Sequence, residues 1–281
     1  MTELRRRMIE DMQLRGLSSG TQHGYVRSVR VLAEHYHRPP DQLSDEQLRE
    51  FFLYLMRERN LAKATLINYR AAIKFFFMTT LQRPLPVLQL VRAERRRKLP
   101  VILSLEEVQH LLSLVQDPAI RMCLTMIYSC GLRLQEGTRL QVRDIHSSRM
   151  LVHVRRGKGG KDRYVPLPQR SLELLRAYWV QERPSPWLFP DKREADRPLW
   201  RERPYRTLKV VLGKAKIDKD VSVHTLRHSY ATHLLEAGVN LRVIQEILGH
   251  KSPKTTAIYT HLTPRVLAGL QTTINELMAP L

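Results

Sequence analysis

The sequence contains few cysteines and no long apolar run. Its two cysteines, Cys123 and Cys130, stand one heptad apart in an apolar stretch of helical character. Residues that far apart along one helix cannot form a disulfide, so we expect reduced core residues. No run of about 18 or more apolar residues occurs, and the Arg-rich, acid-containing N-terminus lacks the apolar core of a secretory signal. These absences argue against a disulfide-rich or membrane-spanning protein and predict a cytoplasmic one.

Acidic residues are scarce relative to basic ones. The chain has 47 Lys plus Arg against 27 Asp plus Glu, a formal net charge of +20. Its hydrophobic content of 43% is ordinary for a globular protein, so disorder does not explain the charge. Counterion release rewards each Lys or Arg that contacts a phosphate. The composition therefore favours nucleic acid as the partner, with a membrane surface as the competing polyanion.

The length and one basic segment predict two domains. A chain of 281 residues is long for one compact unit, and no internal repeat or low-complexity tract divides it. Residues 92–100 are polar and basic and end at Pro100, which is typical of an exposed linker. We predict a helical domain over residues 1–91, this linker, and a second domain over residues 101–281. The linker residues that could contact a DNA backbone are Arg95, Arg96 and Arg97.

The first domain has helical patterns. Apolar residues recur at helical spacing over residues 25–36, before two prolines. Ser44 and Gln47 have capping-box spacing and predict the start of a second helix. A third helix is predicted to begin near Ala62, with basic residues on a side of its own. These residues, which we interpret as a DNA-binding face rather than as solubilising charge, are Lys63, Arg70 and Lys74.

The second domain is predicted to be α-rich with a small antiparallel β-sheet, which makes the whole fold mainly α. Ser104 and Glu107 have capping-box spacing ahead of an apolar helical stripe. From about residue 140 to residue 167 the pattern changes to short β-like runs, among them residues 151–154 and 164–167, which are joined by a basic, glycine-rich hairpin tip. Helical character returns around residues 172–178, and the segment 183–204 is typical of a loop.

Four separated motifs resemble the signature of one enzyme family. They are GLRLQE at residues 131–136, GKG at 157–159, HTLRHSYATH at 224–233, and a last segment that contains LGH at 248–250 and TTAIYTH at 255–261. In this order they resemble the motifs of tyrosine recombinases, the phage integrase family. The helical first domain is similar to the family's core-binding domain. The resemblance thus covers nearly the whole chain and indicates a Xer-like, two-domain member.

The resemblance implies the site, the reaction and the partners. Duplex DNA with paired core sites would be cut one strand at a time, through a 3′-phosphotyrosyl link and a Holliday junction, by a homotetramer. Glu136 would support the first arginine, and Lys161 would contact DNA. The implied catalytic residues are Arg133, Lys158, His224, Arg227, His250 and Tyr259.

These residue types suit reversible phosphodiester cleavage. Attack on the phosphate concentrates negative charge on its nonbridging oxygens, and Arg133 and Arg227 offer planar, permanently charged forks of donors. A phosphotyrosyl ester on Tyr259 keeps the broken strand covalently bound, and phenolate is a competent leaving group when the strand rejoins. We therefore expect neither a metal ion nor ATP. The resemblance implies that Lys158 protonates the departing 5′ hydroxyl.

Each motif alone has a simpler interpretation. Arg133 could be a surface ion-pair residue and Tyr259 a core residue. His224 and His228 have zinc-ligand spacing, but the segment lacks the glutamate of a zincin motif. We expect His228 and His233 to lie in or beside a packed helix. Two functional alternatives remain, a DNA-binding module with a relic site and a monomeric topoisomerase of type IB.

Two further expectations concern the surroundings of the site. Gly137 follows Glu136 where the family usually has a bulky apolar residue, and we expect it to loosen the helix there. Asn240 and Gly249 should bracket a short helix, and a second helix should begin near Ser252. The two helices would bring His250 close to the tyrosine.

Overall fold

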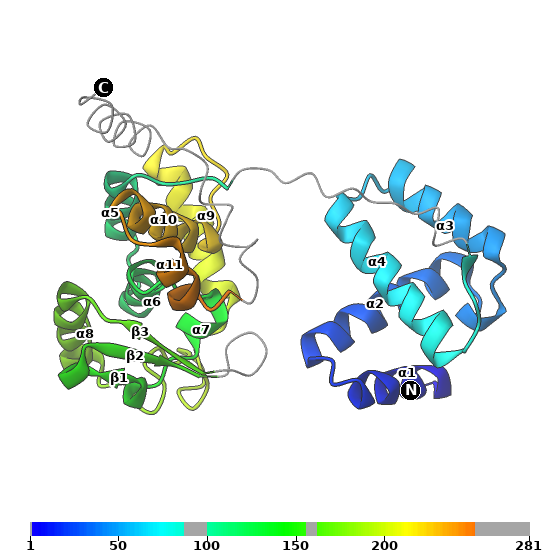
Figure 1. Ribbon diagram of the computed structural model, residues 1–281, viewed down its shortest axis with the longest axis horizontal. Helices are drawn as coiled ribbons and strands as arrows, with labels where there is room; N and C mark the ends of the chain where they lie inside the picture. Colours follow the sequence, from blue (N-terminus) through cyan, green and yellow to red (C-terminus); the bar gives the residue numbers. More distant parts are fainter. Residues whose placement is uncertain (1, 87–99, 156–161, 251–281) are drawn as a thin grey trace, which may run out of the picture. The chain divides into compact units, whose positions relative to one another are not determined.

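The structure is a computed structural model that describes residues 2–86, 100–155 and 162–250. The chain divides into two compact units, residues 1–98 and 99–281 (Figure 1). The predicted linker residues Arg95 to Arg97, both hairpin lysines and Tyr259 lie outside the described residues. No helix among the described residues is long and apolar enough to cross a membrane.

The N-terminal unit consists of helices. They are α1 (Glu3–Leu14), α2 (Ser19–Tyr36), the short 3-10 helix η1 (Pro40–Gln42), α3 (Asp45–Arg57), α4 (Lys63–Phe75) and η2 (Phe76–Thr80), a π-helical turn. The predicted starts of α3 and α4 are confirmed, with a complete Ser44–Gln47 capping box and Ala62 before α4. Burial of the apolar stripes of these helices builds one core around Leu32, Phe51 and Phe76. Each such side chain contributes about 1.5–3 kcal/mol relative to an exposed one.

The second unit combines helices with a three-stranded sheet. Its elements are α5 (Leu105–Ser113), α6 (Pro118–Ser129), α7 (Leu134–Thr138), η4 (Val142–Asp144), β1 (Ile145–His146), η5 (Ser147–Arg149), β2 (Leu151–Val154), β3 (Arg163–Pro166), α8 (Gln169–Glu182), α9 (Glu202–Ala215), α10 (Val223–Glu236) and α11 (Leu241–Leu248). The sheet is antiparallel in the order β1-β2-β3, and Val152 pairs with Val165. The predicted class, mainly α with a small antiparallel sheet, is confirmed.

Helix α6 is the centre of this unit and positions the site. It contacts α5, α7, α8, α9 and α10, and six of its twelve residues are buried. Cys123 lies within it and Cys130 caps it; both are buried and free, as predicted. The chain leaves α6 through Gly131 directly into the GLRLQE motif. A helix with so many neighbours gives this motif a rigid support.

Two α-helices were not expected from the sequence. The helices α1 and α9 had no predicted counterpart, and the loop predicted to reach residue 204 ends where α9 begins at Glu202. Pro204 lies in the first turn of α9, where a missing N–H costs no helical hydrogen bond. Proline is typical of loops but is also tolerated in the first turn of a helix, so the sequence pattern did not indicate that a helix begins here.

Candidate active site

The turn between α6 and α7 presents Arg133 and Glu136. Gly131 has a φ of +60°, and a Cβ there would lie 2.7 Å from the Tyr230 ring, so only glycine fits without displacing neighbours. Arg133 is the N-cap of α7. The Glu136 carboxylate accepts hydrogen bonds from Arg133 N at 2.8 Å and from Arg133 Nη1 at 2.7 Å. The short helix thus folds the carboxylate back onto the arginine that it supports.

Arg227 lies on α10 and is only 3% exposed. Its Nη1 donates to Gly131 O at 2.5 Å, and its Nη2 donates to Leu248 O at 2.6 Å. One guanidinium therefore connects three segments: α10, the turn after α6 and the end of α11. These hydrogen bonds fix the plane of the Arg227 guanidinium group in the absence of a bound phosphate.

The end of α11 places His250 beside the arginines. Asn240 caps the start of this helix and Gly249, with a φ of +62°, ends it, as predicted. Arg133 Nη2 donates to Gly249 O at 3.0 Å. His250 N donates to Gln245 O, and Gln245 Nε2 donates to His250 O at 3.2 Å. The backbone of His250 is thus held at both of its polar groups.

Arg163, at the start of β3, was missed by sequence reasoning. Its Nη1 and Nη2 donate to the two Glu136 carboxylate oxygens at 3.0 and 2.8 Å, and its Nε donates to Ile247 O at 2.8 Å. The side chain is 12% exposed. An arginine at the edge of a predicted hairpin looks like a surface residue, and no local spacing connects it with Glu136.

The Glu136 carboxylate is nearly enclosed by positive charge. Burial alone would raise the pKa of Glu136, but hydrogen bonds and charge from Arg163 and Arg133 outweigh it and lower the pKa to about 2. Arg227 Nη1 lies 3.8 Å from the same carboxylate. Glu136 is therefore ionised at neutral pH and balances part of the positive charge of the site.

The histidines of the site are neutral at neutral pH. Burial, followed by the charges of Arg227 and Arg133, lowers the pKa of His224 and lowers that of His250 to about 4. Burial and the nearby His224 and Arg227 lower the pKa of His228 to about 4 as well. A neutral imidazole has one donor and one acceptor nitrogen. Each of these rings can therefore accept a proton or donate a hydrogen bond.

The structure brings together most of the described residues that the sequence predicted for catalysis. Arg133, Glu136, Arg227 and His250 meet through the contacts above, and the charges of both arginines act on His224. His233 packs beside α6, where Tyr128 Oη and His233 Nδ1 lie 2.9 Å apart. Residues 2–86, 100–155 and 162–250 contain no group of three His, Cys, Asp or Glu side chains that could hold a metal ion.

The helix-loosening expected from Gly137 is wrong. Gly137 lies inside α7 and is buried, and a Cβ at this position would lie 2.6 Å from Ile127 Cγ1 on α6. Glu136 keeps both of its hydrogen bonds from Arg133. Glycine here allows α7 to approach α6 closely, rather than weakening the support of Arg133.

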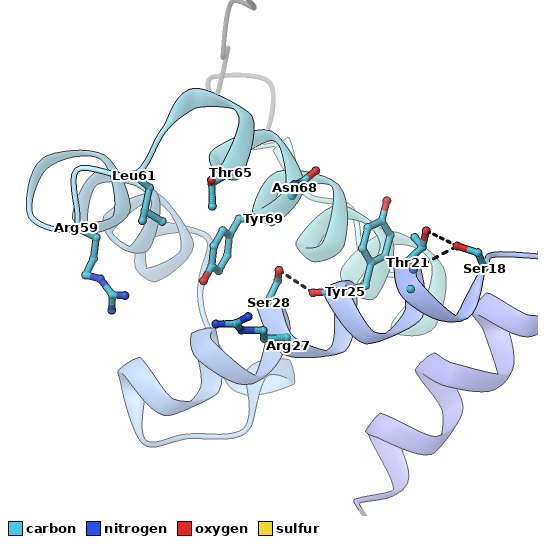
Figure 2. Close-up of a pocket in the computed structure, with 12 residues that line it drawn as sticks. Ser18, Thr21, Tyr25, Arg27, Ser28, Arg59, Leu61, Thr65, Asn68 and Tyr69 are labelled. Carbon is cyan, nitrogen blue, oxygen red and sulfur yellow. Dashed lines mark hydrogen bonds between the residues drawn. The ribbon is translucent and has the colours of Figure 1, made fainter. Parts of the chain in front are cut away.

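A groove of about 630 Å³ marks the N-terminal unit. Figure 2 shows it between α2 and α4, with Arg27 and Thr65 among its lining residues. Gly20 and Gly24 of α2 line the groove without a side chain. Arg59 is a second basic residue of the lining, after Arg27. By helical spacing, the predicted basic face lies on the opposite side of α4 from the groove. The members of that face, none of which lines the groove, are Lys63, Arg70 and Lys74.

Comparison with known proteins agrees with this geometry. Residues 4–87 match the N-terminal SAM-like domain of phage integrases, and residues 102–265 match the phage integrase family. The integrase/recombinase y4qK of Sinorhizobium fredii is 42% identical over 100% of this chain and 91% of its own length. The tyrosine recombinase XerD of Halalkalibacterium halodurans is 34% identical over 89% of each chain.

Solved structures give the same result. The crystal structure of XerA recombinase has a TM-score of 0.56 and 28% identity, and covers 96% of this chain and 97% of its own. The XerH site-specific recombinase bound to palindromic difH substrate in a post-cleavage complex has a TM-score of 0.72 and 22% identity, over 93% of this chain and 82% of its own; it shares the fold. The chain therefore belongs to the phage integrase family and is a tyrosine recombinase, an enzyme that breaks and rejoins DNA through a phosphotyrosyl intermediate.

Proposed function

We propose that this protein is a site-specific recombinase in which Tyr259 is the nucleophile and Arg133 and Arg227 bind the scissile phosphate. The observation that carries the proposal is the convergence of the two guanidiniums on the end of α11, one residue before His250. Backbone carbonyls hold the Arg227 guanidinium, and the Glu136 carboxylate and Gly249 O hold that of Arg133, so the donors need little reorganisation when negative charge develops on the phosphate. Tyr259 follows His250 by nine residues in the sequence.

The proposed step balances one proton taken with one proton given. The Tyr259 hydroxyl oxygen attacks phosphorus, the bond to the 5′ oxygen breaks, and the 3′ end remains on the tyrosine. A histidine, His250 or His224, accepts the phenol proton. Their lowered pKa values leave both rings neutral at neutral pH, so each has an unprotonated nitrogen for this role. Lys158 gives a proton to the departing 5′ oxygen. The free 5′ hydroxyl of the partner duplex then attacks the phosphotyrosyl phosphorus, the Tyr259 oxygen leaves and takes up a proton, and the exchanged strand joins the two duplexes in a Holliday junction.

DNA binding is proposed to use both units. The basic face of α4 and the linker arginines Arg95, Arg96 and Arg97 would contact phosphates, as would Lys161 beside the catalytic lysine. The groove residues Arg27 and Arg59 are further candidates. We propose paired core sites in duplex DNA and a homotetramer as the active assembly. Among the structural neighbours, a lambda integrase fragment is a dimer bound to a core site. A cytoplasmic location stays a prediction.

The test is formation of a covalent adduct. A pool of duplexes of randomised sequence, each with one nick, is incubated with the protein, and DNA that remains attached after denaturation is detected and sequenced. A nick lets a short cleaved fragment escape and traps the intermediate. The wild type should give adducts that share one sequence, and Tyr259→Phe should give none. Tyr164→Phe, which changes an exposed tyrosine on β3, is the matched control and should behave as the wild type.

Other outcomes contradict the proposal. An adduct with Tyr259→Phe would assign the nucleophile to another residue. DNA binding without any adduct would favour a module with a relic site. Adducts of the wild type without sequence preference, together with relaxation of supercoiled plasmid by a monomer, would favour a topoisomerase.

A further inference from the structure

We propose that Arg163 is a positioning residue, which holds Glu136 and the end of α11 so that Arg133 and His250 meet the scissile phosphate together. The inference rests on the proposed function of Arg133 and His250. Arg163 lies on β3, outside the four motifs that identify the family in this sequence. Its side chain donates hydrogen bonds to the Glu136 carboxylate and to Ile247 O near the end of α11.

The first argument is the saturation of the Glu136 carboxylate. A carboxylate offers about four acceptor positions. Oε1 accepts from Arg133 Nη1 and Arg163 Nη1, and Oε2 accepts from Arg133 N and Arg163 Nη2. Arg163 thus supplies two of the four hydrogen bonds and forms the bidentate pair. Without it, the carboxylate could rotate about its last bond, and the Arg133 guanidinium would rotate with it.

The second argument is the end of α11. The last carbonyl groups of a helix have no partner within it and lie at the negative end of its dipole. Three successive carbonyl oxygens here each accept from a different arginine. Ile247 O accepts from Arg163, Leu248 O from Arg227 and Gly249 O from Arg133. Arg163 is therefore the third member of a set whose other two members are the proposed phosphate ligands.

Close packing supports the same role. A Cβ on Gly249 would lie 3.1 Å from Arg163 Cδ and 3.2 Å from Arg163 Nε, so the aliphatic stem of Arg163 lies directly against this glycine. His250 follows Gly249 in the chain. A displacement of Arg163 would therefore move Gly249 and, with it, the backbone of His250.

Lysine cannot reproduce these contacts. Its ammonium is a single point of charge, whereas Arg163 uses three nitrogens in two directions. Arg163→Lys keeps the positive charge beside the buried carboxylate, which makes it the variant that best preserves folding. Arg163→Gln removes the charge as well.

The experiment compares single-turnover adduct formation by the wild type, Arg163→Lys and Arg163→Gln. The substrate is the nicked duplex recovered from wild-type adducts. We expect Arg163→Lys to slow adduct formation by about 100-fold, because a displacement of about 1 Å at a catalytic group has this effect. Affinity for the intact duplex should not change, since Arg163 contacts no DNA in this proposal.

Arg203→Lys is the control, because it alters a comparable ion pair, with Asp117 at 2.9 Å. Asp117 precedes the twelve-residue helix α6 and Arg133 follows it. About 18 Å of helix therefore separates the control ion pair from Arg133.

The pH profile separates positioning from general stability. The charged and titratable groups around Glu136 are Arg133 at the start of α7, Arg163 on β3, and Arg227 and His224 on α10. Loss of the Arg163 charge in Arg163→Gln raises the pKa of Glu136, so the acid limb of adduct formation should move to higher pH. Arg203→Lys should leave that limb unchanged.

A readout that needs no DNA is the NMR titration of His250. Burial and neighbouring positive charges, Arg163 among them, lower its pKa to about 4. Arg163→Gln should raise it, and Arg203→Lys should not. The proposal is wrong if folded Arg163→Lys forms the adduct at the wild-type rate, or if Arg163→Gln leaves the titration of His250 unchanged. Absence of any adduct from the wild type is a different result, which contradicts the proposed function and leaves the His250 titration to decide the role of Arg163.

Discussion

At the scale of single residues, the neutral histidines give the site a dependence on pH. The folded protein keeps His228 and His250 neutral down to about pH 4, whereas the unfolded chain binds protons near the ordinary value of 6.5. Unfolding therefore takes up protons between these values, and stability falls as the pH decreases. A bound phosphate acts in the opposite direction, since its negative charge favours the protonated rings.

The prediction is that His250→Gln reduces the pH dependence of folding. Its free energy of unfolding should fall less steeply than that of the wild type between pH 6.5 and pH 4.5, by at most about 1.4 kcal/mol per pH unit for one proton. Urea unfolding at three pH values measures this. His23→Gln, on the exposed face of α2, is the control for the substitution itself. Parallel curves for His250→Gln and the wild type would show that this ring does not provide the linkage.

Residue identities in the site were predictable only where a motif surrounds them. Arg133, Glu136, Arg227 and His250 come from short, ordered motifs, and the structure brings them together; their catalytic roles stay predictions. Arg163 could not be found in this way, because its partner Glu136 is 27 residues away and on another element. A contact of that kind depends on how the sheet packs against α11, which no local pattern records.

At the scale of elements, the approach of α7 to α6 depends on Gly137. The five-residue helix α7 carries Glu136, and α6 is the most connected helix of the unit. Because a Cβ at Gly137 would lie 2.6 Å from Ile127 Cγ1 and 3.6 Å from Cys123 Sγ, α7 would have to move to accommodate one. The carboxylate would move with it.

We expect Gly137→Ala to lower the free energy of unfolding by about 1–3 kcal/mol, the usual cost of overpacking. Gly213→Ala is the matched control, because Gly213 lies in α9 and a Cβ there would have no neighbour within 4 Å, and it should stabilise by about 0.5–1 kcal/mol. Urea unfolding measures both. Adding Ile127→Ala should cost less in the Gly137→Ala background than in the wild type. Equal costs in both backgrounds would show that the two sites do not interact.

Elements were predicted where caps and apolar stripes coincide. Ser44 and Ser104 begin helices with complete capping boxes, and α11 lies between the residues expected to bracket it. The helix α1 escaped prediction because it buries only Met8 and Met12 among charged residues. The strand β1 lies within the stretch predicted to be β-like, but its two residues are too few for an alternating pattern to give its bounds.

At the scale of the whole molecule, the charge of +20 makes DNA binding an ion-exchange reaction. Each phosphate contact releases a counterion, so affinity should fall steeply with salt. For about 6–10 contacts, the loss between roughly 50 and 200 mM salt is on the order of 10³–10⁵. This dependence is set by the number of contacts and not by the DNA sequence.

The proposed basic face of α4 can be tested by the slope of this dependence. The double variant Lys63→Gln with Lys74→Gln should lower the slope of log affinity against log salt by about 0.9 for each lost contact, so by about 2 in total. Titrations at four salt concentrations measure it. Arg170→Gln removes an exposed charge on α8 and is the control. A slope equal to that of the wild type would move the DNA contacts away from this face, with Arg27 and Arg59 of the groove as the next residues to change.

The arginines held by main-chain carbonyls have a consequence for sequence drift. Because Gly131, Ile247, Leu248 and Gly249 contribute backbone oxygens to the site, these contacts depend on the path and length of the main chain rather than on the chemistry of a side chain. An insertion or deletion of one residue between Leu248 and His250 would instead displace the carbonyl that Arg133 uses, while those of Arg163 and Arg227 stay in place. Descendants of this enzyme should therefore keep the spacing of the site and the glycines at Gly131, Gly137 and Gly249, while other side chains there can change.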